Sequence, residues 1–219
     1  MVRRPLSPFY KAVQNISIVI SLFLASYFFS ASQNTAEYQK MAQAKLVDEY
    51  GKVQQPLFSP DDGIREVLLG LIASETQRII IAAYMITDRQ IVQELIKAHE
   101  RGVVIEIIVC RSGAQDSWSK IDQLIAAGIS VYAYPAAVIK SLMHNKFIIF
   151  FSVTLGGAQR TILATGSYNM TNAASDANQE NFLFLEQRAI VKKYQQRFEH
   201  LKKRALRMRR SLRAKRCAR

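Results

Sequence analysis

The sequence predicts an α/β fold, with a mixed, largely parallel sheet flanked by helices on both faces. Apolar, β-branched segments alternate along the chain with segments whose apolar residues recur at helical spacing. A continuous apolar run is typical of a strand buried on both faces, and alternation of such strands with helices is typical of a parallel sheet. The strands are predicted at residues 78–84, 103–110 and 129–134, and the helices at residues 61–74, 87–101 and 117–127.

Local signals at the ends of these helices support the assignment. Asp61 or Asp62 can cap the first helix, and Thr87 or Asp88 can cap the second, because a short side-chain oxygen accepts hydrogen bonds from the first free N–H groups. Gly128 follows the third helix and is typical of a helix end.

The second half of the chain is predicted to complete the sheet. Residues 147–150 and 161–164 are apolar and are predicted to form two strands joined by an enlarged hairpin that contains a Gly-Gly pair. A further strand is predicted over residues 181–186, and a long C-terminal helix over residues 187–213.

The first 32 residues have the composition of an export signal. Three basic residues precede an apolar run of fourteen residues at 16–29, and small residues follow it. That run is short for a spanning helix and suits a signal peptide, whereas the stretch 12–32 is long enough to span a membrane, and a buried core helix is the third possibility. Residues 1–32 are predicted to be a signal peptide or signal anchor, so that the remainder is exported as a periplasmic, secreted or membrane-anchored protein.

The remaining chain is predicted to hold one folded domain with appendages. Residues 33–56 are polar and are predicted to be a linker or stalk, and residues 57–201 form the domain. The tail, residues 202–219, carries ten Lys or Arg and no acid, which leaves 20 basic against 17 acidic side chains elsewhere. The net charge of +13 therefore belongs mostly to the tail, which favours nucleic acid or an anionic phospholipid membrane as a partner.

One group of polar residues has the chemistry needed to cleave a phosphodiester. His144 can attack phosphorus as a nucleophile or carry a proton. Lys146 and Asn169 can donate to phosphoryl oxygens, and Ser167 lies in a turn whose N–H groups can bind phosphate. Glu180 can orient the imidazole and stabilise its charged form.

These side chains are predicted to meet at one edge of the sheet. His144 and Lys146 are two residues apart at the predicted start of a strand, so their side chains point to the same face. Ser167 and Asn169 follow the next strand, and Glu180 opens the last one. Three neighbouring strand ends therefore bring five side chains to a position where open α/β sheets bind ligands.

The same residues resemble the signature of the phospholipase D superfamily, which is H-x-K-x4-D-x6-G-S-x-N. His144, Lys146, Gly166, Ser167 and Asn169 match this pattern. Further segments resemble the small bacterial, single-motif, endonuclease-like (Nuc-type) members, and the likeness extends over about residues 57–200. These segments are 58–60, 79–84, 101–103 and 178–181.

Two departures from the signature concern the segment between the two halves of the motif. Phe151 stands where the motif has its Asp, and the gap from Lys146 to Gly166 is longer than the signature allows. The enlarged hairpin accounts for the second departure. In this family the Asp is the motif residue least directly tied to the chemistry.

The resemblance implies a metal-independent phosphodiesterase that forms a phosphohistidine intermediate on His144, with Lys146, Ser167 and Asn169 binding the substrate phosphate. Members of the family need two H-x-K motifs in one active site, and this chain has one. The resemblance therefore implies a homodimer with a shared active site. No metal and no cofactor are expected, because the His and Cys residues show no metal-ligand spacing.

The implied substrate is DNA or RNA, which makes the chain an endonuclease. The first alternative is a phospholipase D or cardiolipin hydrolase that acts on phospholipids. The second is a catalytically inactive nucleic-acid or membrane binding module, which the replacement at Phe151 suggests.

Overall fold

The computed structural model describes residue 16 and residues 19–20, 34–135 and 142–208. The chain divides into two units, Met1–Glu37 and Tyr38–Arg219. The predicted export segment lies outside the described residues except for Ile16, Val19 and Ile20, which are helical and exposed. Among the described residues, no helix has both the length and the apolar character needed to cross a membrane.

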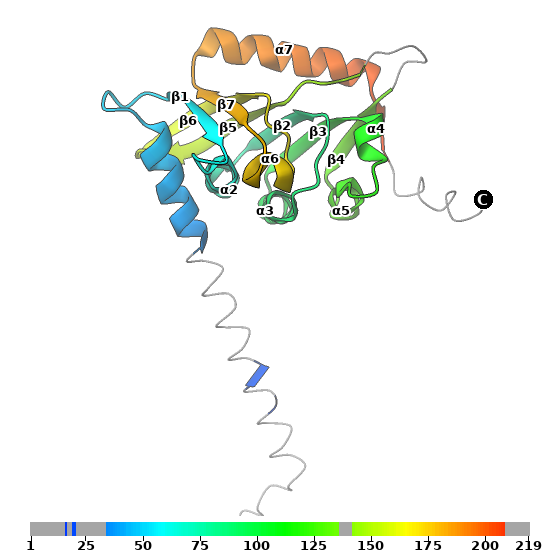
Figure 1. Ribbon diagram of the computed structural model, residues 1–219, viewed down its shortest axis with the longest axis horizontal. Helices are drawn as coiled ribbons and strands as arrows, with labels where there is room; N and C mark the ends of the chain where they lie inside the picture. The colour runs from blue at the N-terminus through cyan, green and yellow to red at the C-terminus, as the bar shows by residue number, and fades with distance from the viewer. Residues whose placement is uncertain (1–15, 17–18, 21–33, 136–141, 209–219) are drawn as a thin grey trace, which may run out of the picture. The chain divides into compact units, whose positions relative to one another are not determined.

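A single sheet organises the second unit (Figure 1). Among the described residues it has eight strands. From one edge to the other they are β1 (Gln54–Ser59), β7 (Glu180–Leu185), β6 (Ala158–Gly166), β5 (Phe147–Leu155), β2 (Arg78–Ala83), β3 (Val104–Cys110), β4 (Ser130–Tyr134) and β8 (Leu206–Arg207).

The sheet is mixed, but the prediction that it is largely parallel is only partly right. Strands β2, β3 and β4 are mutually parallel, and every other neighbouring pair in the described part of the sheet is antiparallel. A parallel connection needs a long crossover, which helices provide between β2, β3 and β4. A tight turn at Gly156 and Gly157 reverses the chain between β5 and β6, and the segment that contains α6 returns it antiparallel from β6 to β7.

Helices cover both faces of the sheet, as predicted (Figure 1). One face carries α2 (Ile64–Ser74), α3 (Arg89–Glu100) and α5 (Ile121–Ala126), and the other carries α7 (Arg188–Arg204). The strand β2 shows why both faces are buried, because Ile79 and Ile81 join the core beneath the first group while Ile80 joins the core beneath α7. Two short helices, α4 (Arg111–Ala114) and α6 (Asn172–Asp176), follow β3 and β6.

The N-terminal boundary of the folded unit differs from the predicted one. Residues 34–46 are helical, and Ala42 and Leu46 are buried in the core, although they belong to the segment predicted to be a linker or stalk. This helix packs closely on α2, because a Cβ on Gly70 would lie 2.3 Å from the backbone oxygen of Tyr38. β1 begins at Gln54, before the predicted domain start at residue 57. Its proline is tolerated because β1 is an edge strand.

The helix ends and the C-terminal segment also differ from the sequence-based expectation. Asp88 caps α3 as predicted, whereas α2 begins after Gly63 without a side-chain cap. α7 ends at Arg204, earlier than predicted, because β8 then pairs with β4. The first residues of the predicted basic tail are therefore part of the fold, and residues 209–219 lie outside the described part of the chain.

The hairpin between β5 and β6 has long strands and a tight turn. Each strand has nine residues, and Gly156 and Gly157 connect them with φ of 61° and 73°. Two positive φ values in a two-residue loop define a type I′ turn, which glycine adopts without strain. The longer motif spacing is thus taken up by strand length.

Candidate active site

The ends of β5, β6 and β7 lie side by side and bring the two halves of the motif together. The backbone N–H of Gly166 donates to the carbonyl oxygen of Lys146 at 3.4 Å, and Thr165 Oγ1 donates to the same oxygen at 3.2 Å. Gly166 in turn pairs with Phe182 of β7. Because β5 and β7 begin where β6 ends, the antiparallel arrangement delivers the predicted residues to one edge.

His144 and Lys146 are in direct contact. The Nζ of Lys146 lies 3.1 Å from Nε2 of His144 and 3.2 Å from the carbonyl oxygen of His144. An ammonium group only donates, so the contact suits the form of the ring in which Nε2 offers its lone pair, which is the nucleophilic form. His144 is exposed, whereas Lys146 is 8% exposed, so the nucleophile faces solvent above a buried cation.

Tyr84, at the end of β2, contacts both residues and was not among the predicted site residues. Its ring is edge-on to that of His144, with centroids 5.1 Å apart, and Nζ of Lys146 lies 5.8 Å from its centroid. Its backbone packs closely on α4, because a Cβ added to Gly113 would lie only 1.9 Å from the backbone carbonyl oxygen of Tyr84. The sequence shows only an aromatic residue at the end of a buried strand. Tyr84 comes close to His144 because β2 pairs with β5, and these two strands are far apart in the sequence.

Burial and a nearby carboxylate act on Lys146 in opposite directions. Burial lowers the pKa of the Lys146 ammonium, and the negative charge of Glu180 partly offsets this effect. Glu180 also accepts a hydrogen bond from Asn178 Nδ2 at 3.2 Å. Among the described residues no hydrogen bond joins Glu180 to His144, so the expected orienting role of Glu180 stays a prediction.

Ser167 ties the turn after β6 to β7. Its backbone N–H donates to the carbonyl oxygen of Asn181 at 3.0 Å, and its Oγ accepts from the backbone N–H of Asn181 at 3.1 Å. Both polar groups of Ser167 are therefore engaged in positioning the turn, which also carries Asn169.

The Asn169 side chain is half-buried and incompletely paired. Its Oδ1 is buried and has no hydrogen-bond partner among the described residues. An unpaired buried acceptor costs about 1–3 kcal/mol, and rotation of the amide would turn its N–H groups toward an incoming anion. This feature fits a group that is completed by substrate.

The segment that carries Asn169 is held by the two residues that precede α3. The backbone N–H groups of Thr87 and Asp88 both donate to the carbonyl oxygen of Met170, at 2.9 and 3.0 Å. Asp88 is fully buried, and its carboxylate accepts from Nε of Arg65 at 2.7 Å. Asn169 is thus held by rigid elements while its side chain stays available.

Phe151 lies away from this edge. It follows Lys146 by five residues along β5, or about 16 Å at strand spacing. Its ring packs under α7 with the guanidinium of Arg78 5.1 Å from its centroid, beside a bulge between Phe150 and Val153. The replacement of the motif Asp therefore removes no polar group from the strand ends.

Comparison with known proteins places the chain in a family. The family model described as cardiolipin synthase, phospholipase D-like domain matches residues 68–202. The chain belongs to this phospholipase D-like family of phosphodiesterases. Among the described residues, no group of three or more His, Cys, Asp or Glu is placed to hold a metal ion.

Individual relatives support this membership of the phospholipase D-like family. A phospholipase D of Rickettsia prowazekii is 30% identical over 187 residues, which cover 83% of this chain and 85% of the relative. A phospholipase D of Rickettsia felis is 32% identical over 139 residues, which are 64% of each protein, so the match spans less than two thirds of that relative. In structure, the phospholipase D family member Nuc of Salmonella typhimurium matches with a TM-score of 0.60 and 23% identity, over 71% of this chain and 97% of Nuc.

Proposed function

We propose that the chain is a metal-independent phosphodiesterase that cleaves nucleic acid with His144 as the nucleophile. The observation that carries the proposal is the 3.1 Å contact between Nε2 of His144 and Nζ of Lys146, together with the buried, unpaired Oδ1 of Asn169 in the turn after β6. The phosphate of a substrate would take the place of the imidazole as the partner of Lys146. Asn169 would then donate to a second phosphoryl oxygen.

The reaction would run in two displacements. Nε2 of His144 attacks phosphorus, the bond from phosphorus to the leaving oxygen breaks, and a phosphohistidine forms. His144 of the partner subunit starts as the imidazolium, donates a proton to the leaving oxygen and then takes a proton from water. The resulting hydroxide attacks phosphorus and breaks the P–N bond, which restores both imidazoles.

This scheme requires a symmetric homodimer, because each chain supplies one His144. We propose that the two copies meet at the sheet edge that carries His144, so that the active site is shared. Sedimentation should then give a dimer at the concentrations used for assay. Mixing wild-type chains with His144→Ala chains should reduce activity more steeply than the fraction of wild-type chains, and a strictly proportional decrease would contradict a shared site.

The direct test is plasmid cleavage by the full-length chain in excess EDTA. Wild-type protein should nick the plasmid, and His144→Ala should not. His99→Gln should behave as wild type, because His99 lies at the end of α3, next to Val103 just before β3, and not at the strand ends that carry His144. Loss of activity in EDTA, or equal activity in His144→Ala, would contradict the mechanism.

The alternative substrate is a phospholipid, as the names of the Rickettsia relatives suggest. The same protein pair should therefore be assayed on cardiolipin and phosphatidylcholine vesicles. Cleavage of vesicle lipid without cleavage of plasmid would assign the chain to phospholipids. Failure of wild type on both substrates would favour the inactive binding module.

We also propose that the protein is exported, on the strength of the basic and apolar N-terminal segment alone. A fusion of residues 1–56 to a reporter that is active only outside the cytoplasm should be active. A reporter that remains inactive would contradict export.

A further inference from the structure

Positive charge is concentrated on the outward face of α7. This helix contains seven Lys or Arg residues and one acidic residue, Glu199. Six of the basic side chains are exposed, and they are Arg188, Lys192, Lys193, Arg197, Lys203 and Arg204.

These exposed charges are not neutralised by acidic neighbours. Among the described residues, none of the six forms an ion pair, whereas Lys202 on the inner side of α7 pairs with Glu106. The guanidinium of Arg204 instead lies over the ring of Tyr134, 5.8 Å from its centroid. A row of unpaired cations on one rigid helix attracts a polyanion.

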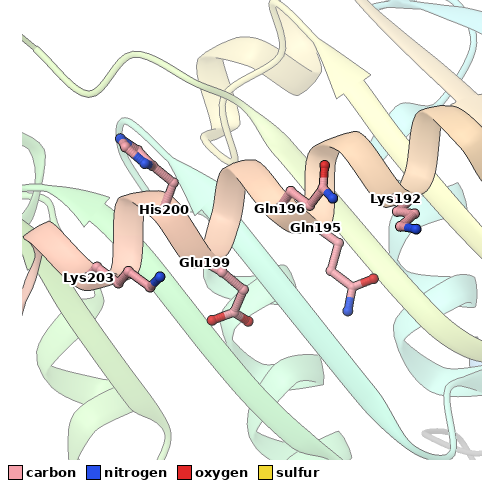
Figure 2. A pocket seen from close by; sticks show the side chains of 6 residues that line it. All are labelled: Lys192, Gln195, Gln196, Glu199, His200 and Lys203. Atoms are coloured by element: carbon pink, nitrogen blue, oxygen red, sulfur yellow. The ribbon is translucent and has the colours of Figure 1, made fainter.

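The outer surface of α7 also offers neutral hydrogen-bonding groups between its charges. Figure 2 shows a shallow depression lined by side chains from successive turns of α7. They are Lys192, Gln195, Gln196, Glu199, His200 and Lys203. Amide and imidazole groups beside ammonium groups suit the phosphate and sugar oxygens of a nucleic-acid backbone.

The same helix is fastened to the strands that carry the active site. The ring of Tyr194 is edge-on to that of Phe147, with centroids 5.1 Å apart. Thr165 Oγ1 lies 3.3 Å from the hydroxyl of Tyr194 and 3.2 Å from the carbonyl oxygen of Lys146. Since an α-helix is about 10–12 Å across, the outward face of α7 lies about one helix diameter above these strand ends.

From this placement we infer that the outward face of α7 is a nucleic-acid track that holds the backbone of the substrate beside the active site. The inference rests on the proposed function. It adds the surface that binds the part of the nucleic acid beyond the reacting phosphate. A membrane surface suits the helix less well. Its apolar residues, including Val191, Phe198 and Leu201, face the sheet, and no exposed large apolar side chain of the described residues lies on α7.

The test is the salt dependence of DNA binding by the full-length chain, measured by fluorescence anisotropy with a labelled duplex. Every protein carries His144→Ala, so that the duplex stays intact. Removal of three cations by Lys192→Gln, Arg197→Gln and Lys203→Gln should weaken binding and make the log–log salt slope shallower by about 2 to 3, because each phosphate contact contributes about 0.9. Gln is a good helix former, so α7 should remain folded.

The matched control removes three cations from other surfaces, by Lys40→Gln, Lys52→Gln and Lys97→Gln. This variant has the same net charge as the α7 variant, but its affinity and salt slope should stay near those of the parent. Equal behaviour of the two triple variants would overturn the track. Unchanged DNA binding by the α7 variant, together with lost binding to phosphatidylcholine–phosphatidylserine vesicles, would overturn it in favour of a membrane surface.

A second measurement separates this inference from the proposed function. With His144 intact, the α7 variant should hydrolyse the small diester bis(4-nitrophenyl) phosphate at the wild-type rate, because that substrate does not reach α7, while its plasmid cleavage falls. A wild-type chain that hydrolyses neither substrate contradicts the proposed catalysis, yet the anisotropy experiment still decides whether α7 binds DNA.

Discussion

Replacement of Gly166 by alanine should damage the active site through a single backbone contact. A Cβ at this position would lie 2.2 Å from the carbonyl oxygen of Asn181, whereas ordinary contacts of this kind begin at 3.4 Å. The atom in the way is backbone, so the ends of β6 and β7 must separate by about 1 Å. The turn that carries Ser167 and Asn169 would move with β6.

The magnitude follows from the contacts that separation breaks. The hydrogen bonds from Ser167 N to Asn181 O and from Asn181 N to Ser167 Oγ should be lost, at about 1 kcal/mol each, or about 2 kcal/mol of unfolding free energy. Displacement of a catalytic group by about 1 Å reduces turnover by about 100-fold. Urea unfolding and diester hydrolysis in EDTA measure the two effects on the same preparation.

Gly157→Ala provides the control at the other end of the same hairpin. Its φ of 73° makes alanine unfavourable by about 1–2 kcal/mol, but its Cβ would meet nothing within 4 Å. This variant should lose comparable stability and keep wild-type turnover. If Gly166→Ala is as active as Gly157→Ala, the turn after β6 does not position the reacting groups and the reasoning is wrong.

Three further predictions concern two groups at the site and one buried carboxylate elsewhere in the sheet. Tyr84→Leu should lower turnover about three- to tenfold, because an aromatic contact contributes about 0.5–1.5 kcal/mol, and Tyr84→Phe should restore it. An equal loss in both variants would implicate the hydroxyl instead of the ring. Burial lowers the pKa of Lys146 below the ordinary lysine value of about 10.4. Activity that needs the Lys146 ammonium should therefore decline at an alkaline pH below that value. In a pH–rate profile, Lys146→Arg should move this alkaline decline to higher pH. Burial alone would raise the pKa of Glu106, but hydrogen bonds from Lys202 and Arg78 lower it overall. The hydrogen bonds of ionised Glu106 therefore stabilise the fold above the ordinary glutamate pKa, and this contribution is lost as pH falls through the lowered pKa. Urea unfolding at several pH values should show this pH dependence in wild type and not in Glu106→Gln.

The sequence predicted the elements that depend on local patterning. The alternation of β2, α3, β3, α5 and β4 followed from apolar periodicity, and the Asp88 cap of α3 followed from the chemistry of a free helix N-terminus. β1 was missed because an edge strand buries little surface, and its segment contains glutamines and a proline. α4 was missed because four residues are too short to establish a helical period.

The candidate site was predicted to the extent that its residues are close in sequence or occupy adjacent strands. His144 and Lys146 are two residues apart, so extended backbone alone places them on one side, and the structure puts their nitrogens in contact. Tyr84 was not predicted, because it reaches His144 only through the antiparallel pairing of β2 with β5. Whether Glu180 orients His144 depends on the distance between the carboxylate and the imidazole, which spacing along the chain does not determine.

By itself, then, the sequence determined the chemistry and the succession of elements, since side-chain type and periodicity are local properties. Only the tertiary structure decided the strand order β1-β7-β6-β5-β2, the burial of Ala42, Leu46 and Val53 in the core, and the position of α7 over the strands of the site. These features depend on which surfaces bury each other across long separations in the chain. Many such pairings satisfy the same local pattern, and the packed molecule selects the one that buries its apolar faces and pairs its backbone groups together.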